Sequence, residues 1–130
     1  MKLEYAGHKI DCNDIMGIRV FKGREEIIFL EITFYEYDSL GDAIQIYIRE
    51  SYNDGAVMSD ILIFDNGDTL FNIDPEYETN GSSIEVAEIL DKYNIENNKE
   101  YGLLLKISDI NDGIEIFKQA LRELYAFNLN

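Results

Sequence analysis

The sequence predicts an α+β fold in which an antiparallel β-meander sheet is packed by two helices, giving two layers. Three observations lead to this prediction. Apolar and polar residues alternate as in strands through most of the first 74 positions, the breaks between these segments are short, and two later segments repeat apolar residues at helical spacing. The 130 residues, of which 46% are hydrophobic, are enough for one α+β domain spanning residues 1–130 with its own core.

The strand patterns occur at residues 2–11, which read as two short strands around a turn, and at residues 15–23, 25–37, 43–51 and 57–65. The segment 25–37 carries apolar residues on both faces, which is typical of a strand in the interior of a sheet. The connections are a few residues long, too short for the crossover that parallel strands need. Successive strands are therefore expected to pair antiparallel.

An Asn-Gly pair at Asn66 and Gly67 interrupts the stretch ILIFDNGDTLFNID. Asn-Gly between apolar runs is the strongest short-range hairpin signal, because a type I′ turn requires positive φ at both central residues. The sequence therefore predicts that ILIFD and DTLFNI are paired strands, with Asp65 and Asp68 exposed beside the turn. The substitution Asp65→Asn is expected to leave stability nearly unchanged.

A helix is predicted at residues 83–94, after Pro75 ends the meander. Ser82 and Glu85 form an S-x-x-E capping box, and apolar residues then recur at helical spacing.

The last part of the chain predicts a polar break at residues 95–100, a strand at 101–108 and an amphipathic helix at 111–128. Asp109 or Asn111 is expected to cap this helix. The predicted core consists of Ile28, Leu30, Ile32, Phe34, Ile46, Leu104, Phe117 and Leu121.

The chain is strongly acidic, with 26 acidic and 11 basic side chains and a net charge of −15. This charge disfavours nucleic acid and anionic membranes as partners and favours encounter with a basic protein. The other explanation of the acidity is that it only keeps the protein in solution. We find no apolar run long enough for a membrane span and no signal-peptide pattern. Cys12 is the single cysteine. A cytoplasmic location is therefore expected.

The stretch ILIFDNGDTL resembles the haloacid dehalogenase-like phosphatases at Asp65, Thr69 and Leu70. The resemblance implies that Asp65 attacks phosphorus and that a second Asp two residues later acts as acid and base. Gly67 occupies that second place, and Asp68 stands where the family has glycine. Since the leaving group then lacks a proton donor, we reject this interpretation and predict no catalytic residue.

A mixed group of possible metal ligands occurs at His8, Asp11, Cys12 and Asp14. On a short strand Asp11 and Cys12 point to opposite faces, and a second soft ligand is missing. The sequence therefore predicts no metal site and no cofactor.

The size, acidity and layout of the chain resemble those of the immunity proteins of bacterial toxin systems. This resemblance implies a protein that binds and neutralises a cognate basic toxin domain, often a nuclease, by covering it with an acidic surface. Tyrosines set among acids, at FYEYD and DPEYE, suit such recognition. The predicted partner-binding residues are Asp65, Asp68, Asp74, Glu76, Tyr77 and Glu78.

Two alternatives remain. One is a non-catalytic adaptor or structural module of unknown partner, for example one that dimerises through an exposed strand edge. The other is a small-ligand-binding or enzyme domain whose pocket residues are not adjacent in the sequence. The sequence does not decide between monomer and dimer.

Overall fold

The computed structural model describes residues 3–11, 14–23, 28–38, 41–53, 56–73 and 84–127. These residues form the following elements in chain order: β1 (Leu3–Tyr5), β2 (His8–Ile10), β3 (Ile15–Lys22), β4 (Ile28–Tyr37), β5 (Ala43–Asn53), β6 (Ala56–Phe64), α1 (Asp68–Ile73), α3 (Ile84–Lys92), β7 (Glu96–Asn98), β8 (Gly102–Ile107) and α4 (Ile110–Phe127).

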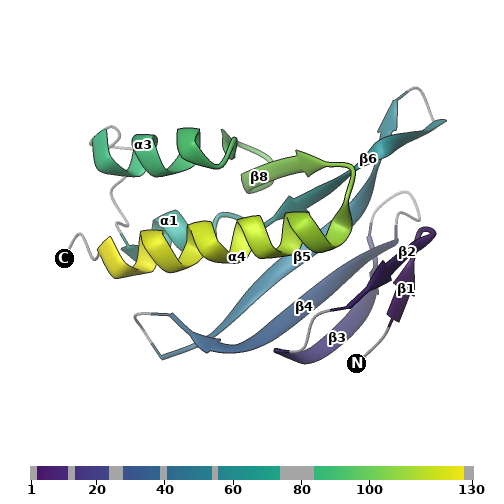
Figure 1. Cartoon of the computed structure of the whole chain (residues 1–130), viewed down its shortest axis with the longest axis horizontal. Coiled ribbons are helices and arrows are strands. Elements are labelled where there is room, and N and C mark those ends of the chain that lie inside the picture. The colour runs from purple at the N-terminus through teal and green to yellow at the C-terminus, as the bar shows by residue number, and fades with distance from the viewer. Residues whose placement is uncertain are drawn as a thin grey trace.

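The main sheet has six strands in the order β3-β4-β5-β6-β8-β7, and all neighbouring strands are antiparallel. β1 and β2 form a separate two-stranded hairpin. The four strands from β3 to β6 follow one another as a meander, because their connections are short. Helix α4 lies across one face of the sheet (Figure 1). The predicted α+β fold, with an antiparallel meander and two layers, is confirmed.

The core lies between α4 and this face of the sheet. Helical spacing places Ile110, Ile114, Phe117, Leu121 and Leu124 on the buried side of α4. The facing strands contribute the alternate residues that the sequence pattern predicted. Buried members of the predicted core in this layer are Leu30, Ile32, Phe34, Ile46, Phe117 and Leu121.

Two members of the predicted core lie elsewhere. Leu104 is buried on the opposite face of the sheet, in a smaller cluster with Leu62 and Phe64. Ile28 was predicted to be buried and is 49% exposed, so this prediction is wrong. Ile28 begins β4 and pairs with Lys22, the last residue of the edge strand β3, at the border of the sheet.

The predicted hairpin at Asn66 and Gly67 is wrong in its second strand. Both residues do have positive φ, 62° and 86°, as the turn requires. The chain that follows is helix α1, and β6 pairs instead with β8, placing Phe64 opposite Leu104. A long-range partner strand has therefore overridden the local hairpin preference.

The C-terminal elements are close to those predicted. Asp109 caps α4, since its Oδ1 accepts a hydrogen bond of 3.0 Å from the backbone N–H of Asp112. The predicted polar break contains the short strand β7. Its three residues are all polar and are too few to show an alternating pattern, so the sequence did not indicate a strand here. Ser82, the predicted cap of α3, lies outside the described residues.

Candidate functional site

The position of the candidate site follows from the unequal lengths of β5 and β6. β5 begins at Ala43, but its pairing with β6 starts only at Tyr47, opposite Phe64. β6 ends there, and the turn at Asn66 and Gly67 leads the chain into α1. On the side of β6 the first part of β5 therefore has no strand partner, and there it lines a cavity together with the start of α1.

A cavity of about 480 Å³ lies at this place, between the β4–β5 turn, the start of α1 and the last turns of α4. Three of its lining side chains are carboxylates, and among its described lining residues none is basic. The lining residues are Asp38, Asp42, Ala43, Ile44, Gln45, Asp68, Thr69 and Tyr125.

Hydrogen bonds within the β4–β5 turn hold two of these acids in place. The Asp38 N–H donates to the Asp42 carbonyl at 2.8 Å, and the Asp42 N–H donates to Asp38 Oδ1 at 3.0 Å. Asp42 is exposed and lines the cavity. These two bonds hold Asp38 and Asp42 close together, and both residues line the cavity.

Asp68 contributes the third carboxyl group from the first turn of α1. Asp68 is exposed but partly shielded from water, and this partial burial, followed by the negative charge of nearby Asp65, raises its pKa above the usual value. Like-charge repulsion of this kind is relieved when a cation approaches. The cavity is thus an electrostatically favourable place for a positively charged group.

Two tyrosines in the last part of β4, which leads into the turn that lines the cavity, are largely exposed. Tyr35 is 60% exposed and Tyr37 is 62% exposed, at the end of β4. Tyr37 pairs across the sheet with Ala43, which lines the cavity. We call Tyr35, Tyr37, Asp38, Asp42 and Asp68 the Tyr–Asp surface.

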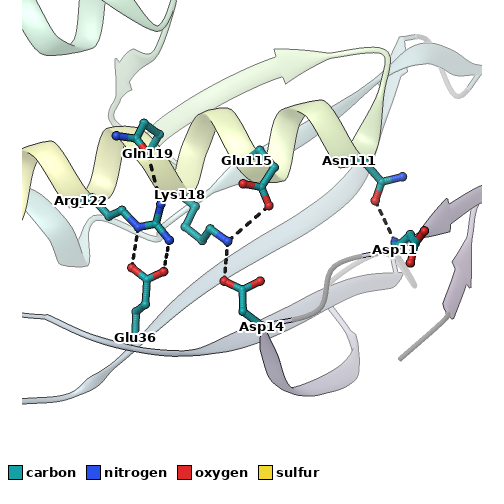
Figure 2. Close-up of polar contacts among 8 residues, drawn as sticks. All are labelled: Asp11, Asp14, Glu36, Asn111, Glu115, Lys118, Gln119 and Arg122. Atoms are coloured by element: carbon teal, nitrogen blue, oxygen red, sulfur yellow. Dashed lines mark hydrogen bonds and ion pairs between the residues drawn. The ribbon is translucent and has the colours of Figure 1, made fainter.

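Ion pairs hold α4 against the sheet (Figure 2), and Tyr125 near the end of this helix lines the cavity. Lys118 Nζ lies 2.5 Å from Asp14 Oδ2 and 3.3 Å from Glu115 Oε1. Arg122 forms two bonds with the Glu36 carboxylate, one of them 2.7 Å long from Nε. Because Arg122 lies one helical turn before Tyr125, these contacts help to position Tyr125, the aromatic residue that lines the cavity.

These pairs shift the pKa values of their members. Burial alone would raise the pKa of Asp14, but the hydrogen bond and charge of Lys118 outweigh burial, so the pKa lies below its usual value. The hydrogen bond from Arg122 lowers the pKa of Glu36. Burial opposes the charge of Lys118, yet Asp14 and Glu115 raise its pKa. Each ion pair therefore favours the charged forms of its members.

The candidate metal ligands of the sequence are used differently. Asp14 pairs with Lys118, and the Asp11 N–H donates to the Asn111 side chain at 2.9 Å. Cys12 lies outside the described residues. Within the described part of the chain, no three His, Cys, Asp or Glu side chains are grouped so that they could hold a metal.

Asp65 is not on the surface, and the prediction that it is exposed is wrong. Its side chain is 1% exposed. Oδ1 accepts hydrogen bonds from the N–H groups of Gly67 at 2.9 Å and Leu103 at 2.8 Å, and Oδ2 accepts one from Thr69 at 3.0 Å. The carboxyl group thus joins the turn, the start of α1 and β8, and it cannot contact a partner protein.

The other predicted partner-binding residues have different outcomes. Asp68 is exposed and lines the cavity. Asp74, Glu76, Tyr77 and Glu78 lie outside the described residues. Sequence reasoning noted the FYEYD segment as a recognition feature but did not include its residues, or Asp42, in the predicted contact set.

Comparison with protein-family models, with curated proteins and with solved structures finds no match to this chain. None of the helices formed by the described residues combines the length and the apolar character needed to cross a membrane.

Proposed function

We propose that this chain is a non-catalytic binding protein that captures a basic protein partner through the Tyr–Asp surface. The observation that carries the proposal is the cavity lined by three carboxylates, together with the exposed Tyr37, whose strand partner Ala43 lines that cavity. A net charge of −15 adds long-range attraction for a basic partner and speeds encounter.

The chemistry of the surface suits an arginine or lysine side chain from the partner. Ligand pockets of roughly 300–1,000 Å³ hold small molecules, so a cavity of about 480 Å³ has room for such a side chain. Carboxylates accept paired hydrogen bonds from a guanidinium group. Tyr35 and Tyr37 offer aromatic faces for cation–π contact and large contact area at small entropic cost.

The more specific proposal is that the partner is the toxic domain of a bacterial toxin and that this chain is its cytoplasmic immunity protein. Nuclease domains bind phosphates with basic clefts, and carboxylates can occupy the places of those phosphates. The support is the resemblance in size, acidity and layout, together with the acidic cavity. No catalytic step is proposed for the chain.

A capture experiment with two charge-matched variants tests this function. The site variant combines Asp42→Lys with Asp68→Lys, and the control combines Glu88→Lys with Asp91→Lys on α3, where both acids are exposed. Both variants have the same net charge, so non-specific attraction is equal. The parent and the control should recover one basic polypeptide from cell lysate, and the site variant should not.

Three results would contradict the proposal. Equal capture by both variants would mean that net charge alone, or another surface, is responsible. Recovery of no basic polypeptide by the parent would leave solubility as the reason for the acidity. Retention of a small cationic molecule in place of a polypeptide would favour the small-ligand-binding alternative.

A further inference from the structure

The face of the sheet that points away from α4 carries a row of five aromatic rings. Neighbouring ring centroids lie 5.4, 6.3, 5.6 and 4.9 Å apart along the row. The rings come from β3, β4, β5, β6 and the residue before β8, so the row crosses the strands. We call Phe21, Phe29, Tyr47, Phe64 and Tyr101 the aromatic row.

Strand alternation places the aromatic row on this face. In β5, Ile46 and Ile48 point to α4, so Tyr47 between them points away. The cluster around Phe64 contains, among the described residues, only sheet residues and Tyr101. Four of the five rings are partly exposed. In the part of the chain that the structure describes, this face has no helix layer.

Charge distinguishes this face from the rest of the molecule. Arg19 lies over the Phe21 ring at 4.6 Å, and Arg49 lies over the Tyr101 ring at 5.7 Å. By alternation, the charged strand residues on this face are three cations and three acids, which balance in a chain whose net charge is −15. They are Arg19, Arg49, Lys106, Glu31, Asp60 and Glu96.

We propose that this face packs against the same face of a second copy of the chain, forming a symmetric dimer across the two aromatic rows. Two copies with a charge of −15 repel each other, so a stable contact needs a face without excess acid. A strongly basic partner would find more favourable charge on the acidic surfaces. An identical copy is the partner whose matching face is also neutral and aromatic.

The size of the face agrees with a dimer interface. Six strands about 4.8 Å apart, averaging about eight residues at 3.3 Å each, give a face roughly 25 Å on each side. Its area, on the order of 600 Å², approaches the roughly 800 Å² per partner of a standard interface. Two sheets packed in this way would lie about 10 Å apart, as in β-sandwiches.

Sedimentation equilibrium of the full chain at several concentrations tests the proposal. A dimer is expected, and it should become tighter as salt rises from about 0.05 to 0.5 M, because salt screens the repulsion between two acidic copies. Binding of a basic partner, in contrast, should weaken with salt. The opposite salt dependences make the failure of one proposal distinguishable from failure of the other.

A pair of variants on one strand locates the interface. Phe21→Asp places a charge in the aromatic row, whereas Val20→Asp places it on the opposite face, where Val20 is 66% exposed. Phe21→Asp should raise the dimer dissociation constant at least about tenfold, which corresponds to roughly 1.4 kcal/mol. Val20→Asp should change the dissociation constant much less.

A second pair keeps the test valid if Phe21→Asp does not fold. Lys106→Glu adds an acid to the same face, and Lys99→Glu makes the same change in an exposed turn. Only Lys106→Glu should weaken the dimer. A monomer at all concentrations and salt levels, or equal effects within both pairs, would overturn the proposal.

Discussion

Removal of the Asp65 carboxyl group should strongly destabilise the fold. This side chain is 1% exposed and accepts three backbone hydrogen bonds, from Gly67, Thr69 and Leu103. Two of these donors belong to the turn and the start of α1, and the third belongs to β8. The side chain of Asp65 therefore connects the turn and α1 with β8, which lies 38 residues further along the chain.

The number of hydrogen bonds sets the size of the effect. Asp65→Ala leaves three backbone N–H groups without their acceptor, and an unsatisfied buried donor costs about 1–3 kcal/mol. Allowing for access of water, we expect the free energy of unfolding to fall by about 3–5 kcal/mol. Asp65→Asn can keep the two bonds to Oδ1 but turns an NH₂ group toward the Thr69 N–H. We expect a loss of about 1–3 kcal/mol.

Urea unfolding followed by far-UV circular dichroism measures both changes. Asp60→Asn, an exposed change in the preceding strand β6, is the control and should stay within about 0.5 kcal/mol of the parent. If Asp65→Asn also stays within that range, the hydrogen-bond argument fails, and the sequence-based expectation of an unchanged stability is correct.

Three further predictions concern the packing of α4, the turn and acid stability. Asp14→Asn should lower the free energy of unfolding by about 1.5–3 kcal/mol in urea titrations, because the buried Lys118 then keeps only the exposed Glu115 as a partner. Lys118→Met should change the free energy of unfolding by less than about 1 kcal/mol. Gly102→Ala should lower the free energy of unfolding by at least about 2 kcal/mol more than Gly41→Ala. Both glycines have positive φ, but only at Gly102 would an added Cβ collide with backbone, at the N atom of Gly67. Equal shifts in the melting temperatures of the two variants would refute this. The lowered pKa values of Asp14 and Glu36 stabilise the fold fully above the unfolded-state values near pH 4. This contribution is lost as the pH falls through the lower folded-state pKa values. The parent should therefore lose more stability between about pH 5 and pH 3 than Glu36→Gln does. An identical loss in the two proteins would contradict the lowered pKa of Glu36.

The strand pattern was predictable because burial of one sheet face imposes a period of two on the sequence. Ile44, Ile46 and Ile48 alternate with polar or aromatic residues, and the structure buries all three against α4. Helix α4 was predictable for the same reason, at a period of 3.6 residues.

The segment after Asn66 and Gly67 could not be predicted from local signals. Its conformation depends on the hydrogen bond from the Leu103 N–H to the Asp65 carboxylate, which joins residues far apart in the sequence. The same limit applies to the candidate site. The cavity exists because β6 ends at Phe64, and alternation of residues does not reveal where a strand loses its partner. Asp68 was predicted from its position beside the turn, whereas Asp42 required the folded structure.

The association rate of the captured partner tests the proposed function most directly. Stopped-flow measurements at about 0.05 and 0.5 M salt would compare the parent, the variant Asp42→Lys with Asp68→Lys, and the charge-matched variant Glu88→Lys with Asp91→Lys. We predict that the first variant associates at least about tenfold more slowly and with a weaker salt dependence, whereas the second stays close to the parent. Equal slowing of the two variants would contradict the assignment of the Tyr–Asp surface as the binding site.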